Sequence, residues 1–400
     1  MQSHTLRKSH HGADRSKFEC VALLLQGGGA LGAYQAGVYD AMAEADLHPD
    51  WVAGISIGAM NAAIIAGNAP EDRIPKLRGF WDRITTKIRF GQHIKQDGSV
   101  PDLPWLQMLM PQGDAARRWF NMMSSSISLF HGQDGFFEPR SVWPWFAQAG
   151  SPGATSYYDT SLLKATLEEF VDFERVNSGD MRLSVGAVNV RTGNFAYFDT
   201  RTHQIRPEHI MASGALPPGF PAVPIDGQLY WDGGLVSNTP LEWVLSNEPV
   251  QDTLAFQIDL WSAVGQFPRD MADVMEREKD IRYSSRTRLN TSRFRERQSL
   301  RHAVASLLDK LPPELQDEEE CKLLRPYVSS RVLSIVHLIY RTKNYESQSK
   351  DYDFSRTAME EHWQSGKESA MRTLRHETIF DPPTNIEGLK VFDLARDGGD

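Results

Sequence analysis

Short apolar runs alternate with segments of helical periodicity at the start of the chain. The runs at 21–26 and 50–55 are β-prone, whereas 33–45 and 59–67 carry apolar or small residues at helical spacing. Strand, helix, strand, helix in this order is typical of a parallel sheet with crossover helices. The pattern therefore predicts an α/β fold, with a mainly parallel central sheet sandwiched by helices.

The pattern continues with further strand signals after residue 180. Residues 181–190 and 195–200 are β-prone and flank a short turn, which predicts a hairpin. Residues 207–223 predict a short helix followed by a proline-rich loop. Residues 228–234 predict a strand that enters a glycine turn, and residues 253–261 predict another buried strand.

Three stretches depart from this pattern and suggest the domain organisation. Residues 1–17 are polar and predict a flexible tail, in which His10 and His11 are solvated. Residues 101–146 are rich in Met, Trp and Phe, which predicts a helical insertion with its own small core and a candidate lid or acyl-chain channel. Residues 262–400 are charged and predict a helical extension, so the main domain is expected to span 18–261.

Composition and charge narrow the class of protein. The chain has 400 residues, of which 40% are hydrophobic and 24% charged, and this is an ordinary globular composition. A net charge of −9 argues against nucleic acid as a partner. Without a long apolar run or an apolar leader, the chain is expected to be cytoplasmic. Cys20 and Cys321 lie far apart, which predicts a reducing compartment and no metal site; oligomeric state does not follow from the sequence.

The first candidate for chemistry is the glycine-rich stretch after the first strand. Gly27, Gly29 and Gly32 match the spacing of a dinucleotide-binding turn. That use needs an acidic residue at the end of the second strand, but Asp46 and Asp50 both precede it. The alternative use is an oxyanion hole, because adjacent glycines let backbone N–H groups converge without a side chain in the way.

The second candidate is the sequence GISIG, in which Gly54 and Gly58 flank Ser56. Its place between a strand and a helix predicts a sharp turn that exposes the serine hydroxyl as a nucleophile. A serine that only caps the following helix is the structural alternative. The sequence favours the nucleophile because both small flanking residues permit a close approach.

A serine nucleophile needs a base, and the histidines of this chain are poor candidates. His203 and His209 precede the only well-placed acid, which is the wrong order for an α/β-hydrolase triad. Asp232 ends a predicted strand and is followed by Gly233 and Gly234. A carboxylate there can accept the serine proton directly, although an Asx turn is the simpler structural explanation.

Four blocks together resemble the patatin-like phospholipases, a family of lipid acyl hydrolases with a Ser–Asp dyad. GGGALG resembles the family's oxyanion loop, and GISIG its nucleophile elbow. ASGALPPGFPAV and DGGLVSNTP resemble the third block and the aspartate block. The blocks occur in the family's order over residues 18–261.

The resemblance implies roles for these residues and for the whole chain. Ser56 is expected to be the nucleophile and Asp232 the base, with an oxyanion hole formed by the amides around Gly27, Gly28 and Gly29. The implied reaction is hydrolysis of lipid carboxylic esters without a cofactor or metal. Leu31 departs from the family, whose loop often carries Arg or Lys there, which puts a phospholipid preference in question.

The charged extension suggests a partner beyond the substrate. It is similar to an extension found on some bacterial members of the family. The window 282–301 holds an arginine run in which Glu296 is the only acid; the arginines are Arg282, Arg286, Arg288, Arg293, Arg295, Arg297 and Arg301. This run predicts either a solvated helical face or peripheral contact with an anionic membrane surface. Two rival functions remain, a non-catalytic membrane-binding scaffold and a dinucleotide-binding oxidoreductase.

Overall fold

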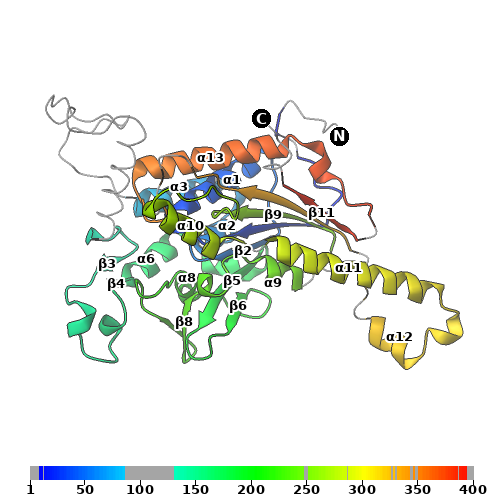
Figure 1. Ribbon diagram of the computed structural model, residues 1–400, viewed down its shortest axis with the longest axis horizontal. Helices are drawn as coiled ribbons and strands as arrows, with labels where there is room; N and C mark the ends of the chain where they lie inside the picture. The colour runs from blue at the N-terminus through cyan, green and yellow to red at the C-terminus, as the bar shows by residue number, and fades with distance from the viewer. Residues whose placement is uncertain are drawn as a thin grey trace.

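The computed structural model describes residues 9–11, 13–85, 130–246, 251–285, 287–325, 328, 331–342, 346, 350–385 and 387–393. A nine-stranded sheet forms the centre of this described part (Figure 1). Its strands are β1 (Cys20–Leu25), β2 (Trp51–Ile55), β5 (Arg182–Asn189), β6 (Phe195–Asp199), β7 (Val223–Ile225), β8 (Gln228–Asp232), β9 (Thr253–Asp259), β10 (Leu333–Ile339) and β11 (Leu389–Phe392).

The sheet is mainly parallel, as the sequence predicts. The strand order is β11-β10-β9-β1-β2-β5-β8-β7, and β6 pairs with β5 outside this path. Neighbouring strands from β11 to β5 pair in parallel. β5 pairs antiparallel with both β6 and β8, and β8 pairs antiparallel with β7. The antiparallel pairing of β5 with β6 confirms the predicted hairpin.

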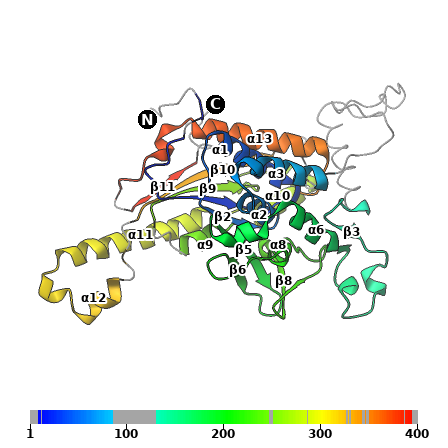
Figure 2. The ribbon, with the colours of Figure 1, turned by 180° about the vertical axis from the view of Figure 1, so that it is seen from behind.

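Helices cover both faces of the sheet (Figures 1 and 2). One core cluster joins the sheet to α1, α2, α3, α8 and α13, and a second joins the opposite face to α9 and α11. The α-helices are α1 (Gly32–Glu44), α2 (Ile57–Ala66), α3 (Pro70–Ile84), α6 (Ser161–Phe170), α7 (Phe173–Ser178), α8 (Pro207–Ser213), α9 (Leu241–Ser246), α10 (Met271–Tyr283), α11 (Thr287–Lys310), α12 (Glu319–Leu324) and α13 (Arg356–Leu374). Shorter elements are η1 (Gly29–Leu31), η3 (Pro144–Phe146), η4 (Pro152–Ala154), η5 (Gly233–Leu235), η6 (Pro313–Leu315), η8 (Glu377–Phe380), β3 (Glu138–Pro139) and β4 (Tyr158–Asp159).

The continuous apolar run of β1 follows from its position in the middle of the sheet. Val21, Leu23 and Leu25 pack into the core cluster that contains α1 and α2. Cys20, Ala22 and Leu24 pack into the cluster on the other face. Successive side chains of a strand point to opposite faces, so a strand that is covered on both sides must be apolar at every position. All six residues of β1 are accordingly buried.

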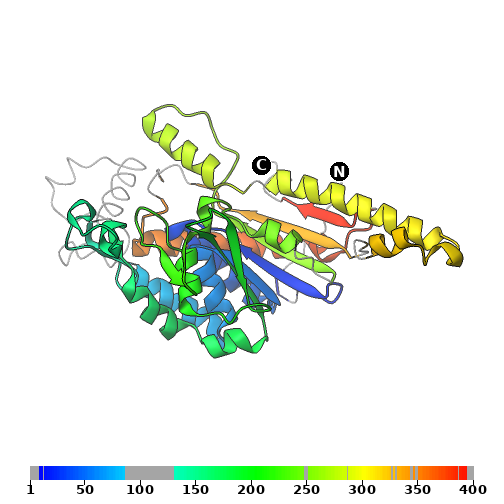
Figure 3. The ribbon, with the colours of Figure 1, turned by 90° about the horizontal axis from the view of Figure 1, so that it is seen from below.

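The region after residue 261 contains more than the predicted helices. α10, α11, α12 and α13 give it the expected helical character, but β10 and β11 extend the central sheet beyond β9. α13 lies along α1 on one face of the sheet (Figure 1). α11 runs beyond the edge of the sheet, with α12 near its far end (Figure 3). The C-terminal region is thus built into the main sheet through its strands.

Two further segments were singled out by the sequence. Most of the Met- and Trp-rich insertion, residues 101–129, lies outside the described residues. The described part of the N-terminal segment is held against the body, which differs from a free tail. His10 is buried and its Nε2 lies 3.1 Å from Glu44 Oε2, while Lys17 Nζ lies 2.7 Å from Asp381 Oδ1. Acidic groups on the body provide these contacts.

Candidate functional site

Ser56 occupies a sharp turn between the end of β2 and the start of α2. Its backbone has φ 55° and ψ −126°, a region that residues with a side chain rarely adopt. The Ser56 N–H donates to Ser213 Oγ at 2.9 Å, and Ser213 Oγ donates to the Gly186 carbonyl at 2.6 Å. Such strain persists only where the surroundings hold it in place. Ser213, which lies within the third block, therefore positions the turn.

The glycines on either side of Ser56 are required by close backbone packing. A Cβ at Gly58 would lie 2.3 Å from the Leu25 carbonyl oxygen at the end of β1. A Cβ at Gly54 would lie 2.3 Å from the Gly58 carbonyl oxygen. The spacing of the GISIG motif is therefore explained by the approach of β2, α2 and β1 around the turn.

Asp232 lies at the end of β8, and its carboxylate faces Ser56. The residue is only 2% exposed. Its Oδ1 accepts a hydrogen bond from Gly234 N at 2.7 Å, and its carboxylate is close enough to the Ser56 side chain for the serine to affect its pKa. Burial raises the pKa of Asp232 to about 7, although the Ser56 side chain and the hydrogen bond from Gly234 N oppose the rise. The carboxyl group therefore changes its charge close to neutral pH.

The glycine loop passes beside the Ser56 side chain. A Cβ at Gly27 would lie 3.1 Å from Ser56 Cβ. The Gly27 N–H donates to the Asn238 carbonyl at 3.2 Å, and the Gly27 carbonyl accepts from Asn238 Nδ2 and Trp261 Nε1, each at 2.9 Å. The Gly27 amide is therefore already engaged, which differs from the expectation that it faces the substrate.

The next two glycines of the loop are more accessible. Gly28 and Gly29 are half-buried, and no acceptor for their N–H groups is found among the described residues. Gly29 has φ 55°, and a Cβ there would lie 2.3 Å from the Asp351 carbonyl oxygen. Position 29 therefore requires glycine for two separate reasons, its backbone conformation and its neighbour.

Ser56, Asp232 and the glycine loop line one cavity of about 320 Å³. Most of its wall is apolar or aromatic, which suits an acyl chain better than a polar ligand. The described lining residues outside the glycine loop include Ile57, Met60, Phe136, Phe137, Tyr157, Tyr158, Leu216, Phe220, Trp261, Tyr283, Tyr352 and Phe354. No histidine is among the described residues that line this cavity, which agrees with the low rank that the sequence gives to the histidines.

The C-terminal region supplies part of the cavity wall, which sequence reasoning missed. Tyr283 ends α10, and Asp351, Tyr352 and Phe354 precede α13. The Asp351 carbonyl accepts a hydrogen bond from Ala30 N at 2.9 Å, so this segment touches the glycine loop directly. No motif marks residues 351–354 in the sequence, and only the fold brings them to the site.

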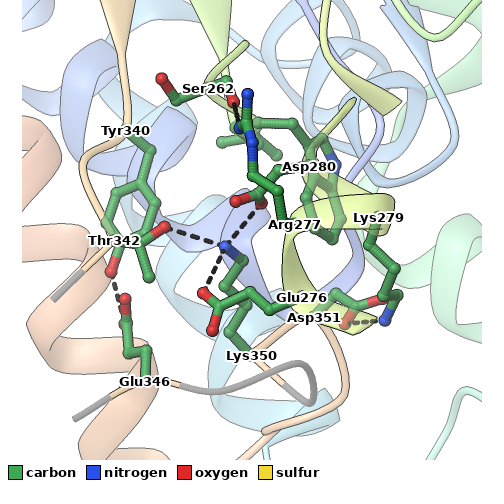
Figure 4. Close-up of polar contacts among 12 residues, drawn as sticks. Ser262, Glu276, Arg277, Lys279, Asp280, Tyr340, Thr342, Glu346, Lys350 and Asp351 are labelled. Atoms are coloured by element: carbon green, nitrogen blue, oxygen red, sulfur yellow. Dashed lines mark hydrogen bonds and ion pairs between the residues drawn. The ribbon is translucent and has the colours of Figure 1, made fainter. Parts of the chain in front are cut away.

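Partly buried ion pairs join this segment to α10 (Figure 4). Lys279 Nζ lies 2.6 Å from Asp351 Oδ1. Lys350 Nζ lies 2.8 Å from Asp280 Oδ1 and 3.2 Å from Glu276 Oε1, and it also donates to Thr342 Oγ1 at 2.8 Å. The Lys350 side chain is only 1% exposed. The pairs therefore hold the segment next to the glycine loop.

Replacing Lys350 with methionine is expected to lower the free energy of unfolding by about 1.5–3 kcal/mol, because two half-buried carboxylates lose their counter-charge and its hydrogen bonds. Burial already raises the pKa of Glu276 and Lys350 opposes that rise, so the loss should shrink as the pH falls and the carboxyls become neutral. Denaturant unfolding at pH 8 and pH 5 measures both effects. Lys310→Met, at an exposed position near the end of α11, is the matched control. Equal losses in the two variants would contradict this role of Lys350.

The acids required for dinucleotide binding do not reach the glycine loop. Asp50 precedes β2 and its carboxylate accepts a hydrogen bond from Val21 N at 2.7 Å, near the start of β1. Asp46 lies in the same connection, and its Oδ1 lies 3.6 Å from His48 Nε2. The loop lies at the opposite, carboxyl ends of these strands. Within the described part of the chain, no group of three or more His, Cys, Asp or Glu side chains forms a candidate metal site.

Comparison with known proteins gives a family for most of the chain. A family model described as patatin-like phospholipase matches residues 23–245, and a second, described as patatin phospholipase, matches residues 281–385. The solved structures that match include the crystal structure of VipD from Legionella pneumophila. That match has 13% sequence identity and a TM-score of 0.35, and covers 94% of this chain and 72% of that chain. No curated protein matches the chain significantly.

Proposed function

Because the chain belongs to the patatin-like phospholipase family, whose members are lipid ester hydrolases, we propose that it cleaves carboxylic esters of lipids with Ser56 as nucleophile and Asp232 as general base. The observation that carries this proposal is that the Ser56 side chain and the buried Asp232 carboxylate line the same apolar cavity, where the Ser56 side chain lowers the pKa of the carboxyl. A hydroxyl beside a base that can accept its proton is the arrangement expected of an activated serine.

The proposed reaction proceeds in two halves. Ser56 Oγ attacks the acyl carbonyl carbon while Asp232 accepts the hydroxyl proton. Protonated Asp232 then gives this proton to the leaving alkoxide, and the acyl group stays on Ser56. Asp232 next accepts a proton from water, whose oxygen attacks the acyl-enzyme. Collapse of the second intermediate releases the carboxylic acid, and Ser56 regains its proton from Asp232.

The glycine loop is proposed to stabilise the oxyanion in both halves. The amides of Gly28 and Gly29 are the donors that fit this role, since the Gly27 amide donates to Asn238. The proposed oxyanion hole therefore uses the amides of two glycines, whereas the sequence suggests three. In comparable sites one such donor contributes about 2.7–4 kcal/mol of transition-state stabilisation.

The cavity supports a lipid acyl group as the part of the substrate that is bound. Its aromatic and aliphatic wall can bury an alkyl chain, and burial of each CH₂ group contributes about 0.8 kcal/mol. Leu31, the position that departs from the family's loop, is fully buried and packs in the core. We therefore propose no contact between residue 31 and a lipid head group. The proposal specifies the class of bond that is cleaved, a carboxylic ester of a lipid, and no particular head group.

The direct test compares hydrolysis of short- and long-chain lipid esters by the wild type and by Ser56→Ala. We expect the variant to lose activity on the order of 10⁶-fold, down to background, while its fold is unchanged. Ser178→Ala, at the exposed end of α7, should keep full activity. If the folded wild type hydrolyses no ester but still associates with lipid, the non-catalytic scaffold replaces this proposal.

A lipid substrate also implies peripheral contact with a lipid surface. None of the helices in the described ranges is both long and apolar enough to cross a bilayer. Part of the arginine run of residues 282–301 is already neutralised, since Arg282 pairs with Glu278 and Arg295 pairs with Glu387 at 2.8 Å. Any attraction of this run to an anionic membrane surface should therefore be modest and should weaken with salt.

A further inference from the structure

Residues 141–158 form a surface that we call the aromatic lobe. It contains η3, η4 and the start of β4, and it projects from one end of the molecule (Figures 1 and 2). Trp145 is 79% exposed and Phe146 is 85% exposed, and Val142 and Trp143 beside them are also exposed. Neighbouring apolar side chains that stay exposed usually mark a binding surface.

The aromatic lobe carries no charge. Residues 141–158 include no Asp, Glu, Lys, Arg or His, although charged side chains make up 24% of the whole chain. A protruding loop that only faces water would ordinarily carry such side chains. The lobe instead combines bulky aromatic groups with small polar residues such as Ser151 and Thr155. This composition is typical of segments that lie at the boundary between lipid and water.

The aromatic lobe is continuous with the cavity that contains Ser56. The Trp143 ring packs edge-on against Tyr157, with their centroids 6.4 Å apart. Tyr157 and its neighbour Tyr158 line the cavity, and Tyr158 also packs against Phe137 and Phe220. A chain of aromatic contacts therefore leads from the exposed lobe to the wall of the cavity.

We infer that the aromatic lobe seats the cavity on a lipid–water interface by inserting Trp145 and Phe146 among the lipids. This inference rests on the proposed function, because the substrate of a lipid ester hydrolase resides in that interface. The attraction comes from burial of apolar surface, so it needs no anionic lipid. It differs from the arginine run of α10 and α11, which would act through charge.

The test measures binding to phosphatidylcholine vesicles, with Ser56→Ala as the background so that the lipid stays intact. We expect the double variant Trp145→Ser/Phe146→Ser to bind about 10- to 100-fold more weakly, at low and high salt alike. Leu323→Ser is the matched control, because Leu323 is an exposed apolar residue on α12, at the opposite end of the molecule (Figure 1). Trp145→Phe/Phe146→Trp should restore binding.

The activity of the lobe variant with Ser56 intact separates this inference from the proposed function. The lobe variant should hydrolyse a soluble short-chain ester at the wild-type rate but hydrolyse vesicle lipid more slowly. Loss on the soluble ester as well would mean that the lobe supports the fold, and would overturn the inference. Unchanged vesicle binding by the lobe variant would also overturn the inference. A change in oligomeric state with no change in vesicle binding would show instead that the lobe contacts a second copy of this chain. Absence of ester hydrolysis by the wild type would contradict only the proposed function.

Discussion

Asp232→Asn is expected to lower kcat by about 10²–10⁴-fold while making the protein more stable. The activity falls because the amide cannot accept the Ser56 proton, whereas Gly234 N can still donate to the Asn oxygen and preserve the turn. The stability rises because the native carboxylate is buried at a cost that its hydrogen bond from Gly234 N and its interaction with Ser56 do not offset. A raised pKa of about 7, against an ordinary value of 3.8, reports that cost.

The sign of the stability change follows from this difference in pKa. The folded protein holds the Asp232 proton more tightly than the unfolded chain does, so ionisation of Asp232 destabilises the fold as the pH rises from about 4 to about 7. Above pH 7 the asparagine variant should therefore be about 2–4 kcal/mol more stable than the wild type. Near pH 4 the two should be equally stable.

Kinetics and denaturant unfolding of the same preparations check both parts of this prediction. Asp309→Asn, at an exposed position on α11, should change neither activity nor stability. An asparagine variant at position 232 that retains activity would remove Asp232 from the mechanism. A variant that loses both activity and stability would show that the carboxylate mainly supports the fold.

Gly29→Ala is the second change with a large expected effect, a fall in kcat of about 10²–10³-fold. The new Cβ would lie 2.3 Å from the backbone oxygen of Asp351, and φ at this position is 55°. The loop must therefore shift, and the proposed oxyanion donors at Gly28 and Gly29 shift with it. KM should change less than kcat, because the amides act on charge that develops only in the transition state.

Gly193→Ala is the control that separates the effect of a positive φ from the effect of the close contact with Asp351. Gly193 also has a positive φ, of 70°, but a Cβ there would meet nothing within 4 Å. It should therefore show the backbone penalty of about 1–2 kcal/mol in stability without any loss of kcat. If Gly29→Ala keeps full kcat in ester hydrolysis, the glycine loop does not hold the oxyanion.

The sequence predicts the parts of the site that local patterns determine. Apolar runs with the period of strands and helices give β1, α1, β2 and α2, and the two junctions between them carry the glycine loop and Ser56. Asp232 follows from its place at the end of a predicted strand. These features depend on a few neighbouring residues, so they can be predicted from the sequence alone.

Features that depend on distant segments were not predicted. The run at 332–340 is apolar and β-prone, but the charged residues around it favoured a purely helical extension. The fold shows that β10 completes the sheet beside β9, and that residues 351–354 reach the cavity as a consequence. Likewise, the Gly27 amide is engaged because Asn238, far along the chain, packs against it. Periodicity carries no information on such pairings.

The central claim is that Ser56 and Asp232 act together, and fluorophosphonate labelling across a range of pH tests it most directly. The adduct should map to the peptide that contains Ser56, and its rate of formation should rise with pH through about 7 as Asp232 ionises. Asp232→Asn should label far more slowly and lose this pH dependence. An adduct on another residue, or a labelling rate in the wild type that does not change between pH 5 and pH 9, would contradict the account.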